Sequence, residues 1–326
     1  MSTNNNEKNE SLLNYLDNFF VVSGEMIDEN GEDSYVFSVN DNIGMLGVFD
    51  GCGGIGSRKY SEYDNKSGAY IAARAASGVT MEWFQQICID KGSVVGNDAD
   101  ELKEKLKNRL RCKLDGLETG TGSSALRGSL SKSFPTTASL ILFEVRGKSI
   151  CSSFIWAGDS RGFVLSSDGL CQITRDDIEG NGDALTNLST DSKLTNLVSA
   201  NEDFLLHSRT VSCDTPAVFI TATDGCFGYF QTPMEFEFML LESLKYAKSI
   251  EQWKNNLESN IRKFTADDYT IGIAVCGYNK FKNLKKTFAS RYAFLNDNYI
   301  SKLDLNNAEI KQALWEEYKK TYYRGA

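Results

Sequence analysis

Hydrophobic and polar residues alternate in short runs along much of this chain, and runs of period two predict β-strands. They cover residues 19–22, 34–39, 43–49, 137–145, 150–157, 162–165, 217–222 and 271–276. Longer stretches with helical spacing cover residues 67–88, 100–117 and 234–261, and a last one begins at Asn306. Hairpin-joined strands with separate helices are typical of an α+β fold. We therefore predict an antiparallel β-sandwich with helices packed on both outer faces, in α-β-β-α layers.

Two of the helical stretches show which face they should bury. The helix over residues 100–117 carries leucines at every fourth position, so one face is apolar. The last helix has Asn306 followed three residues later by Glu309, a capping pattern, and places Ile310, Leu314 and Tyr318 on one face. Residues 179–200 are polar and rich in Gly, Asn, Ser and Thr, which predicts a long loop or a small insert.

Composition narrows the classes of function. The chain has 326 residues, of which 41% are hydrophobic and 24% charged, as in ordinary globular proteins. Its net charge of −9 argues against a nucleic acid or an anionic membrane as the main partner, and we expect neither. An acidic balance suits a protein that binds divalent cations, although solubility alone is the commoner reason. The eight cysteines show no C-x-x-C spacing and His207 is the single histidine, so a zinc finger is not expected.

The N-terminal sequence carries no targeting signal that we recognise. Residues 1–10 are polar and lack the apolar stretch of a signal peptide. No run approaches the roughly 20 apolar residues of a membrane span. The cysteines are therefore expected to be reduced thiols in a cytoplasmic protein.

Three aspartates lie at the ends of predicted strands. Asp50 follows the run 43–49, Asp224 follows the run 217–222, and Asp267 precedes the run 271–276. In an antiparallel sheet the end of one strand lies beside the start of its neighbour, so the three can meet at one rim. A hard divalent cation would relieve the repulsion between them, because magnesium and manganese prefer oxygen ligands.

The residues around Asp50 fit this picture. Gly51, Gly53 and Gly54 let the backbone come close to a metal and adopt positive φ, and the Gly51 carbonyl is a candidate ligand. Two ions close together lower the pKa of a shared water, which then attacks phosphorus without a protein nucleophile. An Asp-Gly pair alone is more often a simple turn, but the pairs in this order argue for a metal site.

Six segments together resemble the metal-dependent protein phosphatases, also called type 2C serine/threonine phosphatases, in the family's order over about residues 19–278. They are Gly31-Glu32-Asp33-Ser34, Val48-Phe49-Asp50-Gly51-Cys52-Gly53-Gly54, Thr136-Thr137-Ala138, Ala157-Gly158-Asp159-Ser160-Arg161, Ala222-Thr223-Asp224-Gly225 and Asp267-Asp268-Tyr269-Thr270. The resemblance implies a phosphoric monoester hydrolase that acts on phosphoserine and phosphothreonine in proteins, with two magnesium or manganese ions and a weaker third site.

The resemblance also implies roles for single residues. Asp50 would bridge both metals, Gly51 would bind one through its carbonyl, and Asp224 and Asp267 would hold the other. Asp159 would serve the third site. The remaining positions are supporting ones: Glu32, Asp33 and Asp268 would orient the ligands and waters, while Ser160 and Arg161 are expected to be structural.

Departures from the family pattern concern the substrate more than the metals. Cys52 stands where animal and plant members usually have a histidine general acid; many bacterial members also lack it, so the chain resembles the bacterial type. Beside two cations, the Cys52 thiol would have a lowered pKa. Asp28 stands where many members have a phosphate-binding arginine, and Arg58 or Lys59 is a candidate replacement, with Arg58 preferred. Phe227-Gly228 replaces a common Trp-Asp pair.

These departures leave an alternative function open. A catalytically weak or inactive phosphatase-like scaffold that binds phosphoproteins would also explain Asp28 and Phe227-Gly228.

The expected parts of the chain are a flexible N-terminus over residues 1–15, a phosphatase-like domain over 16–278 and a basic helical extension over 279–326, which has ten Lys or Arg against five Asp or Glu. The expected partners are a phosphorylated protein and a cognate serine/threonine kinase, and we expect a monomer.

Overall fold

A computed structural model of the protein describes residues 11–90, 93–94, 99–121, 133–147, 149–180, 182–190 and 192–324. It contains two five-stranded sheets whose paired strands are all antiparallel. The first sheet has the order β1 (Leu16–Gly24), β12 (Tyr269–Cys276), β11 (Ala217–Ala222), β8 (Arg161–Ser166) and β9 (Gly169–Gln172). The second has the order β10 (His207–Asp214), β7 (Ser149–Ala157), β6 (Ala138–Arg146), β3 (Ile43–Phe49) and β2 (Ser34–Val39). A small ribbon pairs β4 (Lys59–Tyr60) with β5 (Lys66–Ser67).

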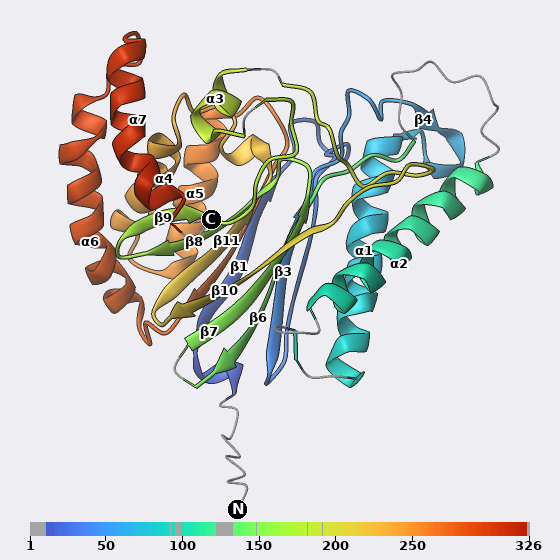
Figure 1. Ribbon diagram of the computed structural model, residues 1–326, viewed down its shortest axis with the longest axis horizontal. Helices are drawn as coiled ribbons and strands as arrows, with labels where there is room; N and C mark the ends of the chain where they lie inside the picture. Colours follow the sequence, from blue (N-terminus) through green and yellow to red (C-terminus); the bar gives the residue numbers. More distant parts are fainter. Residues whose placement is uncertain are drawn as a thin grey trace, which may run out of the picture.

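Helices cover the outer faces of both sheets, so the predicted α-β-β-α sandwich is confirmed (Figure 1). The sheet that contains β2 and β3 is covered by α1 (Gly68–Asp90) and α2 (Ala99–Gly120). The other sheet is covered by α4 (Pro233–Lys245), α5 (Ile250–Phe264), α6 (Phe281–Asn298) and α7 (Ala308–Tyr322). Shorter helical pieces are α3 (Ala184–Ser189) and the 3-10 turns Leu12–Asn14, Ser61–Tyr63, Asp224–Cys226 and Ile300–Lys302.

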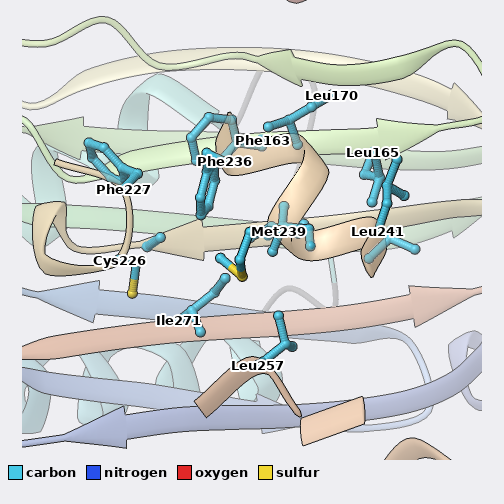
Figure 2. Packing of buried hydrophobic residues seen from close by; sticks show 14 of the residues in the cluster. Phe163, Leu165, Leu170, Cys226, Phe227, Phe236, Met239, Leu241, Leu257 and Ile271 are labelled. Carbon is cyan, nitrogen blue, oxygen red and sulfur yellow. The ribbon is translucent and has the colours of Figure 1, made fainter. Parts of the chain in front are cut away.

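Three apolar layers hold the sandwich together. Between the sheets, Phe143 stacks on Phe219 with ring centroids 6.0 Å apart. Under α2 the four predicted leucines are almost fully buried: Leu102, Leu106, Leu110 and Leu114. Phe236 of α4 and Leu257 of α5 pack on the other sheet, in the same buried cluster as Phe163 of β8 and Ile271 of β12 (Figure 2). The middle layer covers the inner faces of both sheets and the other two cover the outer faces, so the strand ends remain at the rims.

The predicted helix over 234–261 is wrong as a single element. It is two helices, α4 and α5, separated at residues 246–249. Ser249 begins α5 by accepting a hydrogen bond from the backbone N–H of Gln252, which a helix interior would not allow. The polar segment 179–200 contains the short helix α3, which begins at Asp183, a residue whose carboxylate caps its N-terminus.

The C-terminal residues form α6 and α7, which pack on α4. Helix α7 is capped by Asn307 and not by Asn306 as predicted, and its buried face is Trp315, Tyr318 and Tyr322, while Ile310 is exposed. The division of the chain at residue 278 stays a prediction.

A buried polar group connects these helices. Glu237 of α4 accepts hydrogen bonds from Arg291 of α6 at 2.7 and 2.8 Å and from the Tyr318 hydroxyl of α7 at 2.6 Å. All three side chains are almost completely buried. One carboxylate thus links three helices that are distant in sequence.

At the other end of the chain, residues 1–10 of the predicted flexible N-terminus lie outside the described residues. Within the described part, Leu12 is fully buried and its N–H donates to the Asp41 carbonyl at 2.6 Å. Across the described ranges, none of the helices combines the length and the apolar character needed to cross a membrane.

Candidate functional site

Strand register brings acidic residues from both sheets to one rim of the sandwich. Ser34 of β2 pairs with Phe49 of β3, so the preceding Asp33 and the following Asp50 come next in the same register. Ala222 of β11 pairs with Arg161 of β8, and continuing that register two residues brings Asp224 beside Asp159. Two pairs of aspartates, one on each sheet, therefore face the same end of the molecule.

The backbone of Asp50 is fixed by two threonines. Its N–H donates to the Thr137 hydroxyl at 3.1 Å, and its carbonyl accepts from the Thr137 N–H at 2.8 Å and from the Thr136 hydroxyl at 2.9 Å. Thr137 also hydrogen-bonds Ser160 at 2.7 Å, next to Asp159. This supports the predicted structural role of Ser160, because it ties the two rim turns together.

The rim aspartates act on one another electrostatically. Burial, and then the charges of Asp224, Asp33 and Asp159, raise the pKa of Asp50 well above its usual value. Burial also raises the pKa values of Asp159 and Asp224, and the charge of Asp224 adds to the shift of Asp159. The rim carboxylates therefore repel one another, and each is harder to ionise than a solvent-exposed aspartate.

Asp33 belongs to the same cluster and also crosses between the sheets. Its carboxylate accepts a hydrogen bond from the Thr223 hydroxyl at 2.8 Å, directly before Asp224. Burial raises the pKa of Asp33 well above its usual value, and the charges of Asp224 and Asp268 add to this. The predicted supporting residue is thus in place beside the predicted ligands.

Asp267, Glu32 and Asp268 form the other half of the rim. Burial, followed by the charge of Asp224, raises the pKa of Asp267 to about 6. The Asp268 carboxylate accepts from the backbone N–H groups of Met26 and Glu32, both at 2.7 Å. Glu32 in turn accepts a hydrogen bond from the Ser67 hydroxyl, and burial raises its pKa. Asp268 therefore braces the β1–β2 connection against β12, as a supporting residue should.

The donors of this rim fit a hard divalent cation in their chemistry. No group of three or more His, Cys, Asp or Glu side chains in the part of the chain that the structure describes is arranged so that it could hold a metal ion. The rim carboxylates nevertheless raise one another's pKa values, which is the imbalance that magnesium or manganese would relieve. Asp50, Asp224, Asp267 and the Gly51 carbonyl stay the predicted ligands of two ions, and Asp159 stays the predicted ligand of a third.

The glycines after Asp50 serve close approach and not positive φ. None of the three predicted glycines has a φ in the left-handed region. A Cβ at Gly51 would instead lie 2.5 Å from the Ala69 carbonyl oxygen, and one at Gly53 would collide with the Glu32 carboxylate. The sequence prediction of positive φ was therefore wrong. The crowding at Gly51 and Gly53 comes from the Ala69 carbonyl and the Glu32 carboxylate, and a close backbone approach to a metal stays a prediction.

Cys52 lies beside the rim, whereas Arg58 lies over the Tyr60 ring. Burial and the charge of Asp50 raise the pKa of the Cys52 thiol well above its usual value, opposite to the lowered pKa expected beside two cations. The Cys52 sulfur lies 3.8 Å from the Asp50 carbonyl oxygen. The Arg58 guanidinium lies 4.9 Å from the centroid of the Tyr60 ring. A role for Arg58 in phosphate binding stays a prediction.

Sequence reasoning missed two further acids at the rim, Asp176 and Asp177. Asp176 forms a buried, two-pronged pair with Arg161, at 3.0 and 2.7 Å, which bears out the structural role expected for Arg161. Asp177 accepts from the Gly158 N–H at 3.0 Å and lies 2.9 Å from the His207 ring nitrogen. The signal that could have found both is the one used for Asp50, since they follow the end of β9.

Comparisons with known proteins give a consistent fold. No protein-family model matches the chain, and no curated protein sequence does. Solved structures do match. The serine/threonine phosphatase PstP/Ppp of Mycobacterium tuberculosis has a TM-score of 0.55 at 17% identity, over 80% of this chain and 98% of that one. The serine/threonine phosphatase of S. agalactiae has a TM-score of 0.57 at 10% identity, over 80% and 100%.

A third similar structure is PppA, a regulatory component of T6SS in Pseudomonas aeruginosa, with a TM-score of 0.54 at 16% identity, over 81% of this chain and 100% of that one. The chain therefore has the fold of the bacterial PPM-type serine/threonine phosphatases, as the sequence resemblance predicted.

Proposed function

We propose that this chain, with the fold of the PPM-type phosphatases, hydrolyses phosphoserine and phosphothreonine in proteins at a two-metal rim. The observation that carries the proposal is the cluster of Asp33 and Asp50 from one sheet with Asp159 and Asp224 from the other, whose charges act on one another. A structural neighbour, the PstP catalytic domain, is in complex with two manganese ions, at a TM-score of 0.50 and 17% identity.

Each rim residue has a task in the proposed reaction. Magnesium or manganese, when bound, would supply a Lewis acid and lower the pKa of water to near neutrality. Asp50 from one sheet and Asp224 from the other would be ion ligands, with Gly51 and Asp267 as further ligands. Asp159 would serve a weaker third position. Cys52 stands where a general acid would protonate the leaving group.

The supporting residues keep these groups in place. Asp33 fixes the turn before Asp224 through the Thr223 hydroxyl, and Asp268 holds the backbone of Glu32. This preorganisation matters because an ion ligand that must first be ordered binds more weakly. The proposed partners are a phosphorylated protein and a cognate serine/threonine kinase.

Hydrolysis of a phosphothreonine peptide with manganese or magnesium tests the proposal. Asp50→Asn and Asp224→Asn should each lower kcat/KM at least about a thousandfold, because several kcal/mol of charge stabilisation depend on the ions. Asp168→Asn is the matched control. Asp168 is an exposed aspartate in the turn after β8, at the strand's other end from Asp159, and pairs with Arg324.

Two outcomes would overturn the proposal. Activity that Asp50→Asn and Asp224→Asn leave unchanged would place the chemistry elsewhere. No hydrolysis with either metal, combined with binding of the phosphopeptide, would favour the alternative of a phosphatase-like scaffold.

A further inference from the structure

A pocket of about 480 Å³ opens directly beside the acidic rim. Its walls come from the β1–β2 connection, the β4–β5 ribbon, the start of α1 and the start of β12. Glu32 and Asp267 of the rim line it, together with two lysines, Lys59 and Lys66, and the Tyr70 ring. The pocket thus places two lysines in the same cavity as the proposed metal ligand Asp267.

Strand alternation places Lys59 in this pocket and directs its neighbours away. Tyr60 is buried and stacks on Phe134 with ring centroids 4.7 Å apart, and Arg58 lies over the same Tyr60 ring. Because successive side chains of a strand point to opposite faces, Lys59 points away from Tyr60, and it is Lys59 that lines the pocket. Arg58 is not among the lining residues.

Lys59 is also the pocket cation that the fold does not use. Its ammonium makes no hydrogen bond or ion pair with any other described residue, and the side chain is exposed. Lys66, by contrast, donates to the Glu29 carbonyl and, at 3.1 Å, to the Asn30 side chain. Lys66 therefore shapes the pocket wall, while Lys59 is available for a ligand.

The acidic side chains of the pocket do not exclude an anion once metal ions neutralise the charge of the rim carboxylates. Both Asp268 oxygens accept backbone N–H groups, and Glu32 accepts the Ser67 hydroxyl. Asp267 interacts with Asp224 and is a proposed metal ligand. With ions bound at the rim, a doubly negative ligand in the pocket would meet the Lys59 ammonium, which has no partner among the described residues.

We infer that Lys59 binds the phosphoryl group of the substrate and so determines the affinity for phosphomonoesters. This inference rests on the proposed function. A lysine serves as a compact positive charge for phosphate oxygens, without the paired geometry of an arginine. Lys59 belongs to the β4–β5 ribbon, and the same pocket is lined by Glu32 of the β1–β2 connection and by Asp267, which precedes β12.

Three variants distinguish phosphate binding by Lys59 from phosphate binding by Arg58: Lys59→Ala, Lys59→Arg and Arg58→Ala. KM for a phosphothreonine peptide and for a small aryl phosphate should both rise about five- to tenfold in Lys59→Ala, with kcat little changed, as for one exposed charge-assisted contact. Lys59→Arg should restore most of the affinity. Lys286→Ala, an exposed lysine of α6, removes the same charge far from the pocket and should change neither constant.

Calorimetric titration of inorganic phosphate into the manganese-loaded protein provides a readout that does not need turnover. Phosphate affinity should fall by a similar factor in Lys59→Ala and be retained in Lys59→Arg. Equal affinities of wild type and Lys59→Ala would overturn the inference, and so would a loss that follows Arg58→Ala instead.

The outcomes also distinguish the inference from the proposed function. A KM change for the peptide alone, with the aryl phosphate unaffected, would mean that Lys59 contacts a flanking acidic residue, which overturns the assignment. If the wild type hydrolyses nothing, the proposed function fails, and the phosphate titration still decides whether Lys59 binds the anion.

Discussion

Removing the positive charge of Arg291 should destabilise the protein more than the loss of a surface ion pair would. Arg291 donates two hydrogen bonds to Glu237, whose carboxylate is completely buried, and the Tyr318 hydroxyl is its third donor. In Arg291→Met the apolar stem is kept and the charge is lost, so Glu237 stays buried with one partner. Breaking a buried pair on one side costs about 3–5 kcal/mol of unfolding free energy.

Two further variants assign that cost to its cause. Tyr318→Phe removes one hydrogen bond to a charged group and should cost about 1.5–3 kcal/mol. The double variant Glu237→Met/Arg291→Met removes both charges, and it should recover most of the loss of Arg291→Met, since an apolar replacement of a buried pair is often neutral. The matched control is Lys105→Ala on α2, where Lys105 lies 2.6 Å from Glu101 with both side chains about half exposed. That change should cost about 0.3–0.5 kcal/mol.

Urea unfolding followed by circular dichroism measures these free energies, with the m-value as a check on two-state behaviour. An Arg291→Met protein within about 1 kcal/mol of the wild type would refute the reasoning, because an unpaired buried carboxylate should cost far more. A double variant no more stable than Arg291→Met would show that packing, and not the stranded charge of Glu237, sets the cost.

Three other predictions follow from the rim, its turns and the thiols. Manganese at a hundred times its dissociation constant should stabilise the wild type by about 2.7 kcal/mol in a thermal-shift assay and Asp50→Asn by much less, and equal shifts would contradict the proposed ligand. Gly225→Ala should lower the melting temperature, because a Cβ there would collide with the Asp268 carbonyl oxygen; an unchanged melting temperature would show that the backbone can shift. Iodoacetamide at pH 8 should modify exposed Cys112 before Cys213. Burial raises the pKa of Cys213 from 9.0 to about 11, which lowers its thiolate fraction about a hundredfold. Mass spectrometry of timed digests gives the order of modification, and the reverse order would contradict this reasoning.

The strands with strong apolar patterns could be predicted from sequence, and the weakly patterned ones could not. Strands β2, β3 and β11 have the bounds expected from their alternation and apolar runs. Strand β10 was missed because it is a half-exposed edge strand with mainly polar residues, and β9 was missed because it has four residues. Edge strands bury little surface, so their sequences carry little of the period that reveals a strand.

The same limit explains what was missed at the rim. Asp50 and Asp224 were found because they end strongly apolar strands, whereas Asp176 and Asp177 follow the unrecognised β9. The side on which Lys59 lies was also beyond the sequence, because it depends on Tyr60 being the buried residue of a two-residue strand. Sequence alone placed acids at strand ends; which ones face each other depends on register, which long-range pairing sets.

The position of the acids on both sheets makes the sandwich respond to its ionic surroundings. Asp33 and Asp50 follow or precede strands of one sheet, and Asp159 and Asp224 those of the other. Because these carboxylates repel one another, bringing the sheets together at this end costs free energy. Away from the rim, the inner faces of the sheets pack through apolar side chains, with Phe143 stacked on Phe219. Local opening should therefore begin at the acidic end and become rarer as the concentration of divalent cations rises. The protection of these strand-end amides from hydrogen exchange should then increase with the cation concentration.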